Sequence, residues 1–389
     1  MTSMNIVLFI TDLHTGSRIP ELAGIREVAS QEGWHIEEIE LQRLTQPLEK
    51  IVAYWDPLGC IFEGSSHLLP KSTKTWSLPH VHLDPPEEIF TSKTAFVVMN
   101  DDLGIAELAH RELARQDCAS FAFIGWSREV FWSRRRLERF RSILSSMGKP
   151  CTILEDPWTL GNKNDLMSRL MPWIAALPKP CGIFAVNDDV AAVALEACRR
   201  LNLTVPLDVR IVGTDDNPDF CDHTRPSLSS IRPNFRQGGR LAAELLAKRL
   251  ADPTSPPETR VYRPFGVTTR LSTRVLASFG KNVGAALDLI RREACSGLKA
   301  ADVVKALGVS ERIAETRFKA ATGNRITEEI TRVRLARVLE LLANPRQNIG
   351  PIANLCGWDS DIYLKRLFKA RYGMTMREWR ESHSKGSFS

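Results

Sequence analysis

The sequence predicts an α/β domain followed by an all-α domain with two helix-turn-helix motifs. Two observations support this division. Up to about residue 270, short apolar runs such as 5–10, 95–101 and 181–188 alternate with segments of helical length. This alternation is typical of parallel sheets covered by helices. From residue 283 onward the chain has the three- and four-residue apolar spacing of helices instead.

The first domain is expected to be doubly wound, because its strands and helices alternate. The predicted strands cover residues 5–10, 59–64, 80–84, 95–101, 120–126, 151–154, 181–188, 209–216 and, near the end of the domain, 258–262. The predicted helices cover residues 19–32, 103–116, 131–147, 164–176 and 190–201.

Polar side chains cluster where these strands end. They are Asp12, Glu63, Asp101, Asp102, Asn187, Asp188, Asp215 and Asp216. Ligands of open α/β sheets bind outside the carboxyl ends of the strands. Asp and Asn with an Arg can bind vicinal hydroxyls, since carboxylates accept and guanidinium donates hydrogen bonds. Each acid can equally cap the next helix, and for Glu63 and Asp101 a cap or a surface position is expected.

The residues that end this domain resemble a known family. FAVNDDVAAVALEACRRLNLTVPLDVRIVGTDDNP, followed by RPSLSSIRPNFRQGGRLAAELL, is similar to the sensor domain of LacI/GalR-type regulators, which resembles periplasmic sugar-binding proteins. The resemblance implies two lobes with a small sugar between them, and chain crossings near Asp102, Ile231 and Leu271. The residues that it implies or makes candidates for sugar binding are Asp12 and Arg18 (in a loop closing over the sugar), Trp126, Arg136, Asn187, Asp188 and Asp215.

Two of these assignments have alternatives. Arg136 is one of three consecutive arginines, 134–136, any of which could fill the single cationic role. Trp132 could supply the flat apolar face for a sugar ring as well as Trp126.

The second domain is expected at residues 283–389, after a sensor of residues 1–273 and a linker of residues 274–282. The first helix-turn-helix motif is placed at about 300–321 with Gly308 in its turn, and the second at about 351–370 with Gly357 in its turn, where glycine suits the left-handed conformation. A helix at 327–343 would hold the two motifs apart.

One face of each second helix is apolar and the other is polar. Ala314 and Phe318 are expected inside the first motif, and Leu364, Leu367 and Phe368 inside the second. The outward residues, which are the candidate DNA contacts, are Arg312, Glu315, Thr316, Lys319, Asp361, Ile362, Lys365, Arg366 and Lys369.

The base-reading roles follow from side-chain chemistry. Lys365 and Arg366 suit guanine, Thr316 and Ile362 the thymine methyl group, and Glu315 or Asp361 the cytosine amino group. For Glu315 an ion pair with Arg312 or Lys319 is an equal alternative. Lys319 and Lys369 are assigned to phosphate or to solvent.

The charge distribution agrees with a nucleic-acid partner for the second domain alone. From residue 281 onward there are 20 Lys and Arg against 12 Asp and Glu, whereas the rest of the chain is slightly acidic. An excess of positive charge confined to one domain indicates a polyanion partner for that domain.

The last motif also resembles a family. IANLCGWDSDIYLKRLFKARYGMTMREWR is similar to the signature of AraC/XylS-type transcription regulators, although Met376 stands where most members have Pro. A sugar sensor in front of this tail resembles the xylose-operon regulators as a group. The resemblance implies double-stranded DNA and a pentose such as xylose as partners. A homodimer is expected because specificity against genomic competition needs doubled DNA contacts, and RNA polymerase is a further partner if the protein is an activator.

Two other classes of function were weighed against a regulator. A sugar-binding component of a transport system is disfavoured by the basic tail and by an N-terminus without signal-peptide features, so a cytoplasmic protein without a membrane partner is expected. An enzyme is disfavoured because no Gly-rich phosphate loop, GxSxG elbow or metal-spaced His pair occurs. The eight scattered cysteines indicate neither a zinc site nor a structural disulfide, and no cofactor is expected.

Overall fold

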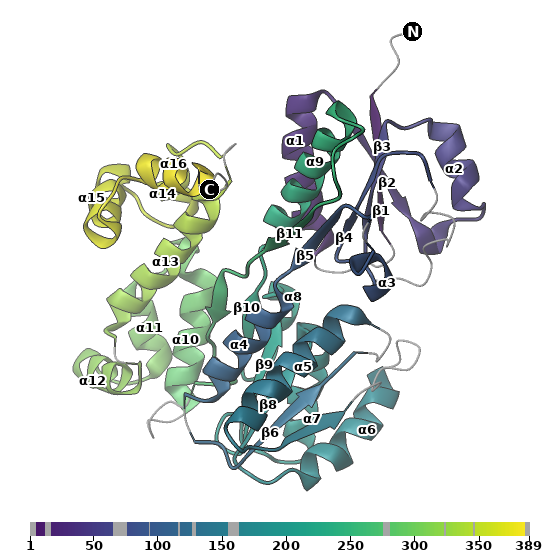
Figure 1. Cartoon of the computed structure of the whole chain (residues 1–389). Helices are drawn as coiled ribbons and strands as arrows, with labels where there is room; N and C mark the ends of the chain where they lie inside the picture. Colours follow the sequence, from purple (N-terminus) through teal and green to yellow (C-terminus); the bar gives the residue numbers. More distant parts are fainter. Residues whose placement is uncertain are drawn as a thin grey trace. The chain divides into compact units, whose positions relative to one another are not determined.

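The chain forms two compact units, Met1–Arg274 and Val275–Ser389, in a computed structural model (Figure 1). The structure describes residues 5–11, 17–64, 76–92, 94–115, 117–126, 130–154, 163–274, 281–322, 324–344 and 347–385. Each unit is described by itself.

The first unit contains two sheets, each the centre of one lobe. The sheet of the first lobe has the strand order β11-β5-β4-β3-β1-β2, and all its pairings are parallel. Its strands are β1 (Ile6–Thr11), β2 (His35–Glu40), β3 (Gly59–Glu63), β4 (His80–Leu83), β5 (Val97–Asn100) and β11 (Thr259–Tyr262). Its helices are α1 (Arg18–Glu32), η1 (Leu41–Arg43), α2 (Leu48–Trp55), α3 (Glu87–Phe90) and α9 (Phe235–Ala251).

The sheet of the second lobe has the order β12-β10-β9-β8-β6-β7, with only β12 antiparallel to its neighbour. Its strands are β6 (Ser120–Ile124), β7 (Cys151–Leu154), β8 (Cys181–Ala185), β9 (Val209–Thr214), β10 (Ser229–Arg232) and β12 (Gly266–Thr268). Its helices are α4 (Asp102–Leu113), α5 (Phe131–Ser146), α6 (Lys163–Ala176), α7 (Asp188–Arg200) and α8 (Pro218–Cys221).

The continuous apolar strands are buried on both faces, as their sequence predicts. In β1, Val7 and Phe9 belong to the core on one side of the sheet, and Leu8 and Ile10 belong to the core on the other. Because side chains alternate across a strand, six consecutive buried residues require a covering layer on each face.

Several elements of the first lobe escaped prediction, among them β2, η1, α2 and α3. The strand β2, with the sequence HIEEIE, lies at the edge of the sheet, and only Ile39 of its six residues is fully buried. An edge strand with charged side chains lacks the apolar run that identifies a central strand. The helix α2 was missed as well.

Helices α1 and α9 lie side by side in Figure 1 and touch through backbone atoms. A Cβ added at Gly239 would lie only 2.0 Å from the carbonyl oxygen of Glu21. Glycine is therefore required at residue 239, and this close contact fixes the start of α1, where Glu21 lies.

The chain crosses between the lobes three times. The first crossing follows β5 at Asp101–Asp102, as predicted. The second follows β10, which contains Ile231 and ends at Arg232, so it lies just beyond the predicted position. The prediction of a third crossing near Leu271 was wrong. Residues 263–265 make that crossing, because the edge strand β12 already belongs to the second sheet.

The second unit is helical throughout its described part. Its helices are α10 (Lys281–Glu293), η3 (Ala294–Ser296), α11 (Ala300–Leu307), α12 (Glu311–Thr322), α13 (Ile326–Leu342), α14 (Ile352–Leu355), α15 (Asp361–Tyr372) and α16 (Met376–Lys385). Gly308 and Gly357 have φ of 68° and 78°, so both predicted turn glycines adopt the left-handed conformation. In the part of the chain that the structure describes, no helix is long and apolar enough to cross a membrane.

Candidate functional site

Carboxylates from both lobes gather at the carboxyl ends of the two sheets. Glu21 is at the start of α1, while Glu63 ends β3 and Asp84 follows β4 in the first lobe; Asp215 follows β9 in the second. Burial raises the pKa of Glu21 well above its usual range, and the charges of Glu63, Asp84 and Asp215 raise it further. This coupling places acids of the two lobes within electrostatic range of one another.

A single arginine is held at the centre of this group. Arg136 of α5 is 5% exposed, and it donates from Nε to Asp102 Oδ1 at 2.9 Å and from Nη1 to the carbonyl oxygen of Val186 at 2.8 Å. Its guanidinium also lies 4.8 Å from the centre of the Trp132 ring. Burial raises the pKa values of Asp102 and Asp215 to about 7, while the positive charge of Arg136 opposes both shifts.

The three consecutive arginines have different positions. Arg134 binds Glu87 of the first lobe at 2.5 Å at the surface. Arg135 lies 3.7 Å from Asp102 Oδ2, with its guanidinium over the ring of Phe90. Of the three, Arg136 is therefore the one buried among the carboxylates.

Three buried acceptors of this region have no hydrogen-bond partner in the described structure. They are Glu21 Oε2, Asn100 Oδ1 and Asp102 Oδ2. Buried polar atoms are normally paired. Unpaired acceptors next to an oriented arginine can accept hydrogen bonds from the hydroxyl groups of a small polyol.

Asp84 is held in place by the first lobe. Its Oδ1 accepts from the backbone N–H of Asn100 at 2.6 Å, and its Oδ2 accepts from the hydroxyl of Tyr262 at 2.5 Å. Burial is the main cause of its raised pKa. Asp84 as a residue is half-buried.

Asp188 has a different environment from the one predicted. It is 1% exposed, its Oδ1 accepts from the Ser230 hydroxyl at 2.6 Å, and its Oδ2 accepts from the backbone N–H of Asn217 at 2.8 Å. The Cys221 thiol donates to the same Oδ2 at 3.2 Å. These hydrogen bonds connect Asp188 to the loop after β9.

Several other predicted residues lie apart from the cluster or only beside it. Asn187 is half-buried and caps α7, because its Oδ1 accepts from Val190 N–H at 3.0 Å. Arg18 donates to Glu38 and Glu40 of β2 at 3.2 and 3.0 Å. None of its described contacts involves the carboxylates clustered at the carboxyl ends of the two sheets. Trp126 packs beside the core of the second lobe. Asp12 lies outside the described residues.

Sequence reasoning missed Glu21, Asp84 and Asn100, and misjudged Glu63. Glu63 is 7% exposed and accepts from the Thr11 hydroxyl at 2.7 Å, so it is neither a cap nor a surface residue. Asp84 and Asn100 follow or end strands, and the strand-end rule could have found them. Glu21 gives no such signal, because it lies within a helix. Asp101 does cap α4, accepting from Gly104 N–H at 2.9 Å.

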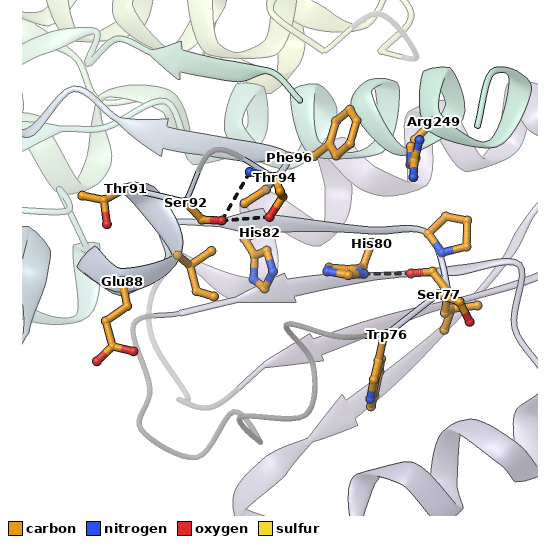
Figure 2. Close-up of a pocket in the computed structure, with 14 residues that line it drawn as sticks. Trp76, Ser77, His80, His82, Glu88, Thr91, Ser92, Thr94, Phe96 and Arg249 are labelled. Carbon is orange, nitrogen blue, oxygen red and sulfur yellow. Dashed lines mark hydrogen bonds between the residues drawn. The ribbon is translucent and has the colours of Figure 1, made fainter. Parts of the chain in front are cut away.

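A cavity of about 550 Å³ opens elsewhere in the first lobe, beside β4 (Figure 2). His80 and His82 reach into it from the strand, with Trp76 and Arg249 at one end. None of the predicted sugar-binding residues that the structure describes lines this cavity. The carboxylate cluster is therefore a separate site.

The first helix-turn-helix motif presents its predicted outer face. Ala314 and Phe318 are fully buried, whereas Arg312, Thr316 and Lys319 are exposed. The backbone carbonyl of Arg312 accepts from the Thr316 hydroxyl at 2.8 Å. Glu315 is half-buried, and its nearest donor is the backbone N–H of Ile326 at 3.5 Å. That contact turns Glu315 toward the start of α13, and neither expected ion pair of Glu315 forms among the described contacts.

In the second motif, Ser360 caps α15, since its hydroxyl accepts from Tyr363 N–H at 3.2 Å. Leu364 and Phe368 are fully buried, and Leu367 packs beside them. The opposite face exposes the predicted residues Asp361, Ile362, Lys365, Arg366 and Lys369.

Two charged residues of this face are already paired. Asp361 accepts from Lys365 Nζ at 2.7 Å, an exposed pair one turn apart. The Arg366 guanidinium lies 5.9 Å from the Tyr363 ring and has no ion-pair partner in the described part of the chain. Arg366 and Lys369 are thus the cations of this face that have no ion-pair partner among the described residues.

Comparisons with known proteins agree with the predicted fold classes of the two domains. Residues 110–273 match a periplasmic binding protein-like domain, and residues 303–382 match a helix-turn-helix domain. The xylose operon regulatory protein of Escherichia coli (strain K12) is 30% identical over 290 residues, which cover 74% of each chain. That of Haemophilus influenzae is 29% identical over 73% of this chain and 74% of its own.

A solved structure extends the similarity to the whole chain. The structure of the xylose-binding transcription activator xylR is 25% identical and covers 98% of this chain and 99% of its own, with a TM-score of 0.61. The predicted order of a two-lobed sensor followed by a helical DNA-binding domain is confirmed by this match.

Proposed function

The chain belongs to the family of the xylose operon regulatory proteins, and from this premise we propose that a pentose, with xylose favoured, controls its binding to DNA. The protein is a DNA-binding transcription regulator with a sugar-binding domain. The identity of the sugar and the residues that bind it are the proposal.

The observation that carries the sugar site is the set of buried acceptors without partners around Arg136. A polyol has several hydroxyl donors close together, and these acceptors can receive them. A phosphorylated sugar fits poorly, because its dianion would meet four or more carboxylates and one described central arginine.

We assign direct sugar contacts to Arg136, Asp102, Asp215, Asp84, Glu21 and Asn100. Asp188 and Asn187 hold the loops of the second lobe around them, Trp126 or Trp132 offers an apolar face, and Asp12 and Arg18 keep their proposed place in a covering loop. The site draws residues from both lobes, so a bound sugar favours the closed arrangement of the lobes.

For DNA we assign α12 and α15 to successive major grooves, about 34 Å apart. Arg366, Lys365 and Ile362 would read bases from α15, and Arg312 and Thr316 from α12. Lys319 and Lys369 would contact phosphate. On DNA, Asp361 would give up its ion pair with Lys365 and accept a hydrogen bond from the cytosine amino group. Glu315 would position α13 through Ile326 rather than read a base.

We propose a cytoplasmic homodimer, because two copies double the DNA contacts available against genomic competition. By likeness to the transcription activator, sugar-bound protein would recruit RNA polymerase. The sugar changes DNA binding only by its unequal affinity for two arrangements of the protein.

The test joins calorimetry to a DNA mobility-shift titration on the full chain. Xylose should bind with a stoichiometry of one per chain, and duplex containing the operator should be retarded with a steep dependence on salt. Glucose and xylose 5-phosphate are the controls for the sugar. If the protein bound no free pentose and no free hexose, the sensor proposal would be refuted. If it retarded no duplex at low salt, the DNA-binding proposal would be refuted.

A further inference from the structure

Two cysteines of the DNA-binding unit lie against each other although they are distant in the sequence. Cys295 is in the middle of η3, just after α10, and is half-buried. Cys356 is the buried residue that ends α14, at the turn of the second helix-turn-helix motif. Their contact connects the first half of the unit to the second.

The backbone around Gly357 brings these residues together. Gly357 has a φ of 78°, and a Cβ there would lie 2.7 Å from the carbonyl oxygen of Ala294 and 3.0 Å from the carbonyl carbon of Cys295. Only glycine allows the turn to rest on η3 in this way. Next to that contact, the side chains of Cys295 and Cys356 are close enough that each shifts the pKa of the other.

The surroundings of Cys295 favour its thiolate. The pKa of Cys295 is lowered to about 7, first by the hydrogen bond from the Cys356 thiol and then by the positive charges of Arg337 and Arg334, against the effect of burial. The same hydrogen bond raises the pKa of Cys356, which remains the donor. Arg334 is held in place because its Nε donates to the carbonyl oxygen of Ala294 at 2.8 Å.

Cys295 differs in this respect from the other cysteines, all of which are in described parts of the chain. Apart from its partner Cys356, burial is the main cause that raises the pKa of the six remaining thiols, and the pKa of Cys151, also half-buried, reaches about 12. Exposure alone therefore does not distinguish Cys295 from Cys151; its charged and hydrogen-bonded surroundings do. A thiolate of this kind next to a second thiol is the arrangement that oxidants convert to a disulfide.

We propose that Cys295 and Cys356 form a reversible redox pair that hydrogen peroxide oxidises to a disulfide. The Cys295 thiolate attacks one peroxide oxygen, the O–O bond breaks, and the hydroxide that leaves takes a proton to become water. The sulfur of Cys356 then attacks the resulting sulfenic acid, and its thiol proton and the sulfenic hydroxyl leave as a second water. Two thiols and one peroxide thus give one disulfide and two waters, and a small dithiol reverses the reaction.

The disulfide would act on DNA binding through the turn at Gly357; this step rests on the proposed function. A disulfide is only ~2.05 Å long, much shorter than a hydrogen bond between two sulfurs. Its formation pulls the turn between α14 and α15 toward η3 and shifts α15 relative to α12. Because both helices must fit successive grooves, the oxidised protein should bind operator DNA at least tenfold more weakly.

The chemical test uses the reduced full chain at pH 7. Alkylation by iodoacetamide should modify Cys295 at least tenfold faster than Cys151. After peroxide, blocking and digestion, mass spectrometry should find the Cys295 and Cys356 peptides joined with the loss of two hydrogens. Cys295→Ser should abolish this product, while Cys151→Ser, the matched control, should leave it unchanged. Alkylation of Cys295 no faster than Cys151, a disulfide between other cysteines, or only sulfinic acid at Cys295 would overturn the pair.

The DNA test separates this inference from the proposed function. Reduced protein, peroxide-treated protein and treated protein restored with dithiothreitol are titrated against the same duplex, with Cys295→Ser as the insensitive control. Weaker binding after oxidation that dithiothreitol restores supports the switch, and equal binding by disulfide-linked protein overturns it. If the reduced protein bound no duplex, the proposed function would be refuted instead. The peptide mapping would still show whether Cys295 and Cys356 form a disulfide.

Discussion

Arg136 donates from Nε to Oδ1 of Asp102 across 2.9 Å, and both side chains are buried. Asp102 begins α4 directly after the first crossing between the lobes, and Arg136 lies on α5. Because Nη1 also binds the carbonyl of Val186, the guanidinium is fixed before any ligand arrives. The pair therefore sets the position of the cation around which the acceptors of the first unit are placed.

Replacing Arg136 by Lys should weaken xylose binding by about tenfold to a hundredfold. Lysine keeps the charge but cannot reproduce the planar set of donors that bind Asp102 and Val186 while reaching a ligand. Calorimetry measures the change. Arg134→Lys is the matched control, since Arg134 lies on the same helix but binds Glu87 at the surface. Equal affinities for the two variants would place Arg136 outside the site.

Sugar binding should release protons near neutral pH. Burial raises the pKa values of Asp102 and Asp215 to about 7, so below that pH the free protein holds these protons. Hydroxyl groups that donate to the ionised carboxylates favour the charged form and lower both pKa values. Affinity should then rise as pH increases toward about 7, by up to about tenfold per pH unit for each proton released, and level off above the pKa of the free carboxyls.

Calorimetry in buffers of different ionisation enthalpy counts these protons directly. Proton uptake, or an affinity that falls as pH rises over this interval, would contradict direct contact between the sugar and ionised carboxylates.

Asp188→Ala should destabilise the sensor unit by roughly 2–4 kcal/mol. The substitution leaves the Ser230 hydroxyl and the Asn217 N–H buried without their acceptor, at about 1–3 kcal/mol for each group. Urea unfolding of the variant measures the loss, with the exposed Asp219→Ala as control. Unchanged stability together with abolished sugar binding would make Asp188 a ligand, as the sequence resemblance implied, rather than a support.

Arg366→Ala should cost about 1–3 kcal/mol of DNA binding and relax the preference at one base pair. The free guanidinium on the outer face of α15 suits guanine O6 and N7. Mobility-shift titrations on operator variants separate loss at one position from general loss. Arg377→Ala removes an exposed charge from α16 and serves as the control. Equal weakening on every duplex would assign Arg366 to phosphate.

The fragment 281–389 should fold alone and bind DNA without responding to sugar. Its second half has its own core around Val338, Ile352, Leu364 and Phe368, all fully buried within the unit. Circular dichroism and thermal unfolding measure folding, and a mobility shift with and without xylose measures the response. An unfolded fragment would show that the sensor unit is needed for the DNA-binding unit to fold.

Most strands of the two sheets could be predicted because they are continuous apolar runs, such as β1, that only a doubly covered sheet can bury. The short strands β10, with the sequence SSIR, and β12, with the sequence GVT, were not predicted. The edge strand β2 could not, because its Glu-rich sequence is stable only beside β1. The two recognition helices were predicted because their buried and exposed faces repeat with the helical period. In each case the prediction depended on whether the segment's own pattern of apolar and polar residues identifies the element.

The sequence by itself determined the order of elements, the two turn glycines, the basic second domain and the membership of a regulator family. Only the tertiary structure decided that Arg136 rather than its neighbours is central, that Glu21 joins the carboxylates from a helix, and that Asp188 supports a loop. It also decided that Cys295 meets Cys356. Periodicity and charge are properties of neighbouring residues, whereas a hydrogen-bond partner or a raised pKa depends on which distant segments packing brings together.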